Sequence, residues 1–506
     1  MIRHVFTVST GTLASRLLGF ARDAMVAALL GAGPVADAFL AAFQIVNVAR
    51  RLLSEGSLNA ALVPAYWRVH DRDGMAAATA FAGRVLGTFS LALFAAAAVL
   101  GIVMPVALGL LAPGFAGTPA LQMAVDDARL MLPYLAFAGP VTVMMGLLNA
   151  HHRFALTAFA PILFNVAMIA AIIALLVRPG SAADAARIVA ATVGIAGLLQ
   201  LVMLATGGGR LAGPLRIGLD RELRGFLGKA LPAMVAGASP QLLIVAGAIV
   251  ASASPAAVSW LYFANRLIEL PLGIVGVAMG TVLVPELTRA ARSGDGAFAQ
   301  TASRAVELAI GLALPAALGL ALLSEPIVRV LFEHGAFTAA DSRATAYALA
   351  WLALGLPAQV ATKALAPAFF ARHDTSGPLA ATVIALAVAL LAATWLAAPF
   401  GVAGIAGAIA AAAWAGVIVL LWRGRARHGF AIDSDARRRL PRIALAALAM
   451  GAALWLGVRT LPTQLGDASH PAIAAMLALA IVAGIVVYGA LLALLGVVRP
   501  RDLRLP

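Results

Sequence analysis

Long apolar runs separated by short polar segments fill almost the whole chain. An α-helix needs about 20 apolar residues to cross the hydrocarbon core of a membrane, and most of these runs reach that length. The pattern predicts an all-α integral membrane protein with about 14 transmembrane helices. The expected spans are 6–30, 37–66, 79–110, 129–150, 156–177, 187–206, 229–252, 257–287, 304–332, 343–371, 379–398, 401–422, 441–458 and 471–498.

Composition supports a membrane protein, because 62% of the residues are hydrophobic and 11% are charged, against about a quarter charged in soluble domains. The net charge is +14, and most of the excess Lys and Arg lies in short loops, which indicates membrane topology rather than a nucleic-acid partner. The chain has no cysteine, so disulfides and thiolate metal sites are excluded. Its histidines show no metal-binding spacing, and we predict neither a metal site nor a cofactor.

Arginines are distributed unevenly between alternate loops. The richer set includes Arg68, Arg153, Arg289, Arg372, a run from Arg423 to Arg442 and the tail from Arg499, whereas the other set holds Arg178, Arg187, Arg343 and Arg459. Because basic loops stay in the cytoplasm, an even number of spans places both termini there. The first span carries no small-residue cleavage signature and is interpreted as a retained helix rather than a signal peptide.

An internal repeat organises the spans. Leu62-Val63-Pro64 recurs 221 residues later as Leu283-Val284-Pro285, and the same shift relates His152 to His373. We therefore predict two parallel lobes of six helices, a common transporter architecture. The expected regions are an N-lobe at 1–206, a cytoplasmic linker at 207–228, a C-lobe at 229–422, a basic cytoplasmic loop at 423–440 and a final helix pair at 441–506. Two interpretations of that pair stay open: extra packing helices, or a surface for a long acyl or prenyl tail.

The first span contains charges that lipid does not explain, within GTLASRLLGFARDAMVAALLG at 11–31. On a helix Ser15 and Arg22 share one line and Arg16 and Asp23 share a neighbouring line, so the polar groups occupy one broad sector. Intramembrane charges usually face a bundle interior or a wet cavity. The sector therefore predicts a polar interior surface.

Other charges are expected at matching depths. The helical rise puts Arg22 and Arg266 about 12–14 Å below the outer surface and Arg16 and Arg50 about 20 Å below it, with Asp37 near the outer mouth. Local ion pairing is the alternative, since Arg51 with Glu55 and Arg266 with Glu269 have helical pair spacing. Taken as a set, guanidinium groups suit a phosphate-bearing ligand, which they bind in a planar, bidentate manner.

Five stretches carry a family resemblance: SRLLGFARDAMVAALLGAGPVADAFLAAFQIVNVARRLLSEG, LVPAY, NAHHRFALTAFAP, VSWLYFANRLIELPLGIVGVAMGTVLVPEL and LAPAFFARHDT. They are similar to the MurJ (MviN) family, the peptidoglycan lipid II flippases of the multidrug/oligosaccharidyl-lipid/polysaccharide exporter superfamily. The resemblance covers essentially the whole chain.

The resemblance implies fourteen helices, with a final pair that forms a groove for an undecaprenyl tail. It implies substrate-binding residues at Ser15, Arg16, Arg22, Asp37, Arg50 and Arg266, and cavity positions at Ala27, Glu55 and Ser259; the charge pattern adds Asp23, Arg51 and Glu269 as supports. Asn265 stands where the family often has an acidic residue. Some members bind sodium in the C-lobe, but spans 7 and 11 lack Asp and Glu, so that site is not transferred.

The expected function is that of a flippase, not an enzyme: it moves lipid II, the undecaprenyl-diphosphate-linked precursor, to the periplasmic leaflet by alternating access in the bacterial inner membrane. Lipid II and membrane lipids are the expected partners of a monomer, and the energy source is open between membrane potential and a cation. Two alternatives remain. One is an exporter of another polyprenyl-linked glycan. The other is a membrane enzyme acting on prenyl phosphates, although Asp23, Asp37 and Glu55 are expected at different depths or faces.

Overall fold

The computed structural model describes residues 2–54, 57–178, 180–208, 211–218, 223–225, 239–278, 286–287, 289–290, 295–372, 374–460 and 470–497. Every regular element within these ranges is a helix. The predicted all-α class is therefore confirmed.

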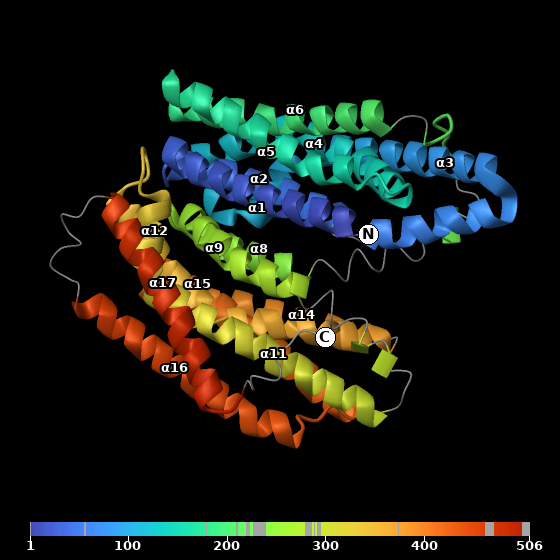
Figure 1. Cartoon of the computed structure of the whole chain (residues 1–506). Coiled ribbons are helices and arrows are strands. Elements are labelled where there is room, and N and C mark those ends of the chain that lie inside the picture. Colours follow the sequence, from blue (N-terminus) through green and yellow to red (C-terminus); the bar gives the residue numbers. More distant parts are fainter. Residues whose placement is uncertain are drawn as a thin grey trace. The chain divides into compact units, whose positions relative to one another are not determined.

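Most of these helices are long (Figure 1). Their bounds are α1 Ile2–Leu30, α2 Pro34–Ser54, α3 Ser57–Leu111, η1 Pro113–Phe115, α4 Pro119–Ala150, α5 Phe154–Val177, α6 Ala182–Gly208, α8 Ser239–Ala251, α9 Ala257–Ala278, α11 Asp295–Leu322, α12 Ser324–Phe332, α13 Ala339–Ala353, α14 Leu356–Ala371, α15 Ser376–His428, α16 Ser434–Thr460 and α17 His470–Leu494.

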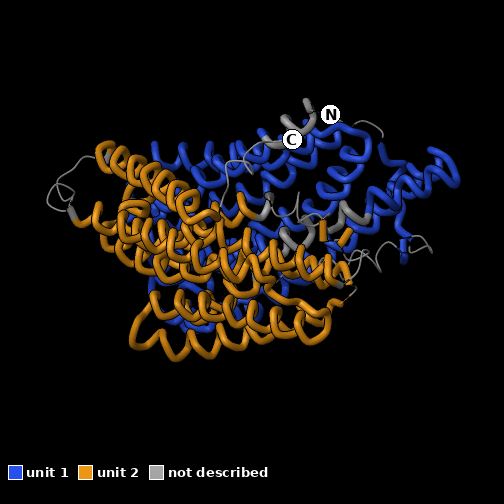
Figure 2. Tube along the Cα trace, turned by 60° about the horizontal axis from the view of Figure 1, so that its bottom comes forward, with its two compact units in different colours: residues 1–241, 252–259, 334–337 blue, residues 242–251, 260–333, 338–506 orange. Residues whose placement is uncertain are grey.

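The chain divides into two compact units (Figure 2). Unit 1 comprises Met1–Gln241, Ser252–Ser259 and His334–Phe337, and unit 2 comprises Leu242–Ala251, Trp260–Glu333 and Thr338–Pro506. Unit 1 thus contains α1 to α6 together with two short segments from the second half of the chain. The segment 252–259 takes part in the site described below, where it binds Asp37.

Helix α4 lies at the centre of unit 1, where it packs against α2, α3 and α6 and is buried along most of its length. Small residues allow close approach: a Cβ on Gly194 of α6 would lie 2.8 Å from the carbonyl oxygen of Leu130, and one on Gly197 would lie 2.7 Å from the ring of Tyr134. Such small-residue contacts are typical of helices that pack within membranes.

In unit 2, α11 packs against α13, α14 and α16, while α15 packs against α13 and α14. Helix α15 contains a break at Gly401, whose φ of 56° is accessible mainly to glycine. The break separates the two predicted spans 379–398 and 401–422. The final pair, α16 and α17, is in mutual contact, and α17 also touches α12.

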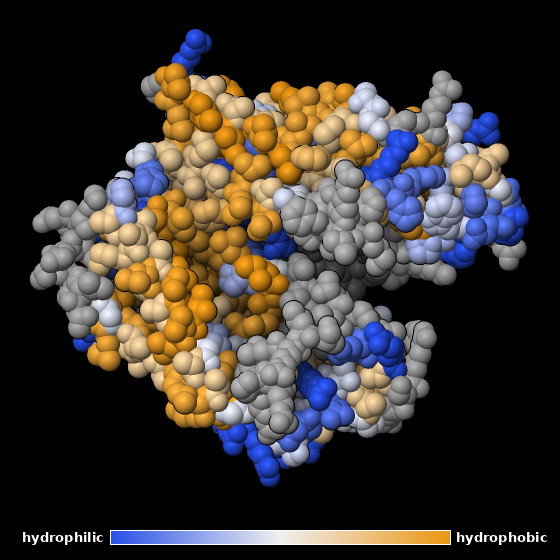
Figure 3. Space-filling model, viewed as in Figure 1, coloured by the Kyte–Doolittle hydropathy of each residue, from blue (hydrophilic) through white to orange (hydrophobic). Residues whose placement is uncertain are grey.

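Length and apolar composition identify the candidate membrane-spanning helices. Within the described residues, eight helices are long and apolar enough to cross a membrane, and α13 with α14 forms a ninth candidate bent by 43°. In Figure 3 hydrophobic side chains cover much of the visible helix surface, and hydrophilic ones gather towards helix ends. Each of the fourteen predicted spans overlaps a helix, or one half of the broken α15.

Several predicted boundaries are wrong. The predicted span 37–66 overlaps both α2, which is described to Ser54, and the start of α3 at Ser57, and residues 55 and 56 lie outside the described part of the chain. Helix α3 then continues through the expected basic loop and bends at Gly74, where φ is 82°. Helix α4 starts at Pro119, not at the predicted residue 129. The prediction is wrong here because the first turns of α4 carry charged residues, including Asp126, and a charged stretch resembles a loop.

Two other predicted spans are interrupted by proline. The span 304–332 breaks between α11 and α12, and 343–371 breaks between α13 and α14. Pro326 and Pro357 lack the N–H that would bond to the carbonyls of Leu322 and Ala353, four residues earlier. Parts of the predicted spans 229–252 and 257–287, and much of the predicted linker, lie outside the described residues.

Candidate functional site

The polar sector of α1 forms a buried network in unit 1. Arg22 is 7% exposed. Its Nε and Nη2 donate to Oδ1 of Asp23 at 2.9 and 2.6 Å, and its Nη1 donates to Oδ1 of Asn165 on α5 at 3.1 Å. The amide nitrogen of Asn165 donates to the carbonyl oxygen of Ser15 at 3.0 Å. One asparagine therefore ties two positions of the α1 sector to α5.

Aromatic rings complete the surroundings of this guanidinium. The Cζ atom of Arg22 lies 5.4 Å from the ring centroid of Phe43 on α2 and 5.5 Å from that of Phe164 on α5. Both distances fall within the range of cation–π attraction. The sequence interpretation missed Asn165, although an isolated amide within the apolar helix α5 was a usable signal.

Asp37, in the first turn of α2, binds the start of α9. Its Oδ2 accepts from the amide of Ala256 at 2.7 Å, and its Oδ1 accepts from the amide and hydroxyl of Ser259 at 2.8 and 2.5 Å. Asp37 and Ser259 are fully buried. A carboxylate is favourable here, because the amides at a helix N-terminus lack intrahelical partners and carry partial positive charge. Two predicted site residues thus meet directly.

In unit 2, Arg266 and Glu269 of α9 form the expected i,i+3 ion pair, with Nη1 donating to Oε2 at 2.8 Å. Both side chains are about one-fifth exposed. The predicted local pairing is confirmed at this position. Whether Arg266 joins the α1 arginines around one cavity stays a prediction, because Arg16 and Arg22 belong to unit 1 and Arg266 to unit 2.

The remaining predicted residues are less informative. Ser15 and Arg16 are half-buried on α1, and Ala27 is buried. Arg50 and Arg51 lie in α2, but their side chains are outside the described part of the chain, as is the whole of Glu55. No group of three His, Asp or Glu side chains that could hold a metal ion occurs in the described ranges.

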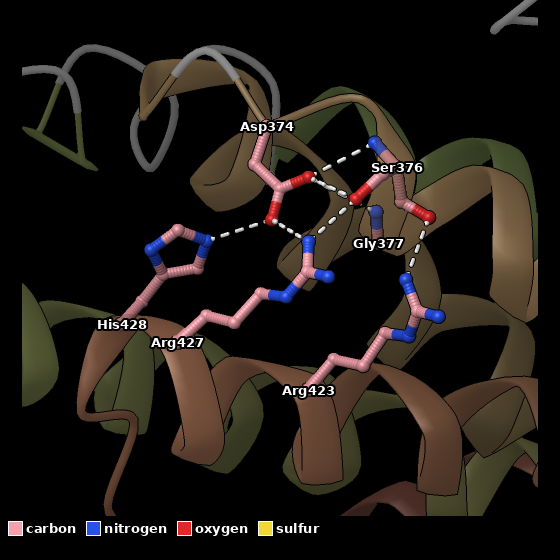
Figure 4. Close-up of polar contacts among 6 residues, drawn as sticks. All are labelled: Asp374, Ser376, Gly377, Arg423, Arg427 and His428. Atoms are coloured by element: carbon pink, nitrogen blue, oxygen red, sulfur yellow. Dashed lines mark hydrogen bonds and ion pairs between the residues drawn. The ribbon is translucent and has the colours of Figure 1, made fainter.

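A separate polar cluster joins the two ends of α15 (Figure 4). Oδ1 of Asp374 accepts from the amides of Ser376 and Gly377 at 2.9 and 3.1 Å, and its Oδ2 lies 3.0 Å from Nε2 of His428. Arg427 donates to the hydroxyl of Ser376 at 2.7 Å. Burial by itself would raise the pKa of Asp374, but hydrogen bonds from Ser376, His428 and Gly377 outweigh it and hold that pKa well below its ordinary value.

Comparison with known proteins identifies the family. The family model described as "Lipid II flippase MurJ" matches residues 26–476. The chain belongs to the MurJ family. A probable lipid II flippase MurJ of Rhizobium meliloti (strain 1021) is 38% identical over 481 residues, which cover 93% of this chain and 89% of that protein.

Solved structures agree with this membership at the level of fold. A lipid II flippase MurJ in an inward closed conformation superposes with a TM-score of 0.78 at 21% identity, covering 96% of this chain and 98% of that one. An inward-facing MATE transporter of the MOP superfamily gives 0.66 at 16% identity, covering 82% and 94%. Its fold is that of these transporters. Membership of the MurJ family, together with the apolar helices, makes the chain a multi-pass inner-membrane protein.

Proposed function

We propose that this protein flips lipid II from the cytoplasmic to the periplasmic leaflet by alternating access. The observation that carries the proposal is the family match over residues 26–476, in a chain whose apolar helices bury Arg22. Guanidinium stays charged at all physiological pH values and binds phosphate oxygens in a bidentate manner. A diphosphate is therefore the part of the substrate that these arginines would recognise.

We assign the diphosphate contacts to Arg16, Arg22, Arg50 and Arg266, with Ser15 as an additional polar contact. Asp23 and Asn165 hold the Arg22 guanidinium, and Glu269 holds that of Arg266. A guanidinium has five N–H groups, so Arg22 keeps donors for a phosphate beyond its three hydrogen bonds to the protein. Ala27, Arg51, Glu55 and Ser259 would complete the cavity wall.

Asp37 would control the outer side of the pathway. Its three hydrogen bonds to the start of α9 attach a segment from the second half of the chain to α2. Opening towards the periplasm would require this contact to separate, whereas loading from the cytoplasm would leave it intact. We therefore interpret the structure's Asp37 contact as an outer closure.

The two lobes and the last helix pair would share the binding of one lipid II molecule. The N-lobe at 1–206 and the C-lobe at 229–422 would enclose the headgroup, and residues 441–506 would hold the prenyl tail at the lipid surface. Both termini would face the cytoplasm. No covalent chemistry is needed, and the protein would act as a monomer driven by the membrane potential or a bound cation.

The test combines cell growth and purified vesicles. Arg16→Ala, Arg22→Ala and Arg266→Ala should each reduce lipid II translocation by about ten- to a hundredfold, because a hydrogen bond to a charged group is worth about 1.5–3 kcal/mol. They should also fail to support growth when the native flippase is depleted. Arg425→Ala, at an exposed position near the end of α15, should behave as wild type.

Normal growth and translocation with all three substitutions would refute the assigned role. The same vesicles distinguish the alternatives. Faster movement of another polyprenyl-linked glycan than of lipid II would favour a different cargo. Release of phosphate, or a chemically altered lipid II, would favour an enzyme.

A further inference from the structure

A four-residue loop from the second half of the chain docks onto the end of α1. Residues His334–Phe337 connect α12 to α13, yet they belong to unit 1 (Figure 2). The amide of Ala336 donates to the carbonyl oxygen of Ala28 at 2.8 Å. We call residues 334–337 the latch segment.

Two glycines make this docking sterically possible. A Cβ on Gly335 would lie 2.3 Å from the carbonyl oxygen of Ala28, and one on Gly31 would lie 2.6 Å from the carbonyl oxygen of Ala336. Both glycines have positive φ, 59° and 65°, a conformation that other residues rarely adopt. Backbone therefore lies directly against backbone, and a larger residue at either position would force the two surfaces to shift.

The latch segment is itself fixed at its far end. The side chain of Phe337 is 2% exposed, and its amide donates to the carbonyl oxygen of His334 within the loop. The next residue, Thr338, caps α13 through a reciprocal capping box with Asp341, which also accepts from the indole of Trp260 at 3.0 Å. The capping box at the start of α13 thus fixes one end of the loop, while Gly335 contacts the end of α1.

The docking position lies next to the Asp37 contact in the sequence. Helix α1 ends at Leu30 and α2 begins at Pro34, so the contacts of the latch segment and of Asp37 lie on either side of the short connection at residues 31–33. Both contacts join this α1–α2 turn to segments from the second half of the chain. The two contacts differ in chemistry. Asp37 binds through a buried carboxylate, whereas the latch segment binds through backbone atoms packed against glycine.

We propose that the latch segment is a second outer closure, independent of Asp37, that must detach from α1 before the headgroup can leave towards the periplasm. This inference rests on the proposed flippase function. The hydrogen bond from the amide of Ala336 to the carbonyl oxygen of Ala28, together with close van der Waals contact, holds the latch segment to α1. Contacts of this kind can form and break in each cycle.

The absence of native cysteine permits a direct test by cross-linking. A Cβ on Gly31 would lie 3.3 Å from the Cβ of Ala336, close to the separation in a disulfide. The double variant Gly31→Cys/Ala336→Cys is reconstituted into vesicles with lipid II. Oxidation should reduce translocation at least tenfold, and reduction should restore it; each single variant should be insensitive to oxidation. Unchanged translocation with the disulfide formed would overturn the latch.

A glycine pair provides a second test if the cysteine variant is inactive when reduced. Gly335→Ala places a Cβ against the backbone of Ala28, whereas Gly117→Ala imposes a similar φ of 73° with nothing within 4 Å. Gly335→Ala should accelerate hydrogen exchange at the amide of Ala336 and lower the translocation rate several-fold, relative to Gly117→Ala. Equal exchange and equal rates in the two variants would overturn the proposal.

The two proposals can fail separately. If wild-type protein moves no lipid II in vesicles, the proposed function fails, whatever the cross-link does. If wild-type protein is active and the cross-linked or Gly335→Ala protein is equally active, the function stands and the latch is wrong.

Discussion

Three carboxylates that are buried or partly buried bind at the N-termini of helices. Asp37 binds the amides at the start of α9, Asp341 caps α13 and Asp374 caps α15. In each case the negative charge meets amides that have no intrahelical partner. Asp374 differs because it also bonds His428, at the other end of the same broken helix (Figure 4).

Asp374→Asn should lower the thermal stability of the purified protein at neutral pH, by about 1–2 kcal/mol, because the ion pair to Arg427 and the bond to His428 weaken. The lowered pKa of Asp374 fixes the sign of the pH dependence. Its contribution is complete above the unfolded-state pKa of about 4 and is lost as pH falls through the lower folded-state value.

Thermal unfolding in detergent between pH 7 and pH 3 checks this prediction. The difference in unfolding temperature between wild type and Asp374→Asn should be constant above about pH 5 and should narrow towards pH 3. Asp435→Asn removes an exposed acid from the first turn of α16 and serves as the control. A difference that stays constant down to pH 3 would show that the carboxylate charge does not stabilise this cluster.

At the scale of elements, residues 211–218 follow the face of α3 and form a strap. The amide of Gly213 donates to the carbonyl oxygen of Thr79 at 2.8 Å, and the amide of Arg216 donates to that of Gly83 at 3.4 Å. Cβ atoms on Gly83 and Gly87 would each lie 2.6 Å from a carbonyl oxygen of the strap. Gly83 and Gly87, one turn apart on α3, thus leave the space in which the strap packs against the helix.

Gly83→Ala should displace the strap and destabilise unit 1 by about 1–3 kcal/mol, as other overpacking substitutions do. Gly109→Ala is the matched control in the same helix, because its Cβ would meet nothing within 4 Å, and it should stabilise α3 by up to about 1 kcal/mol. The rate of limited trypsin cleavage after Arg216 measures whether the strap is docked on α3, and this rate should be higher in Gly83→Ala than in Gly109→Ala. Equal cleavage rates in the two variants would contradict it.

The sequence predicts the helices of this protein better than their interruptions. Continuous hydrophobicity located each span, since a membrane helix must satisfy its own backbone hydrogen bonds. The break at Pro357 has no signal in the hydrophobic pattern, because apolar residues continue across it, whereas the break at Pro326 is marked by the polar pair Ser324 and Glu325 directly before the proline. The pairing of Arg266 with Glu269 follows from helical spacing, whereas Asn165 reaches Arg22 from 143 residues away and needs the packing of α5 on α1.

At the scale of the whole molecule, the charge distribution predicts the orientation in the membrane. The loop between α15 and α16 and the helix ends beside it contain Arg423, Arg425, Arg427 and the Arg437–Arg439 run, whereas the loop between α5 and α6 is flanked by Arg178 and Arg187. Basic loops resist translocation during insertion. The α15–α16 loop should therefore face the cytoplasm, and the α1–α2 turn with its latch segment should face the periplasm.

Single cysteines in this cysteine-free chain test that orientation. Gly180→Cys and Ser434→Cys both replace exposed residues at helix connections. A membrane-impermeant maleimide added to intact spheroplasts should label Gly180→Cys, because its loop lies outside, and should label Ser434→Cys only after the membrane is permeabilised. Both variants should support growth, since neither position lies in the proposed pathway. The reverse labelling pattern would place the Asp37 contact and the latch segment on the cytoplasmic side. The two contacts would then have to open when lipid II is loaded from the cytoplasm, and their assigned role in release to the periplasm would be wrong.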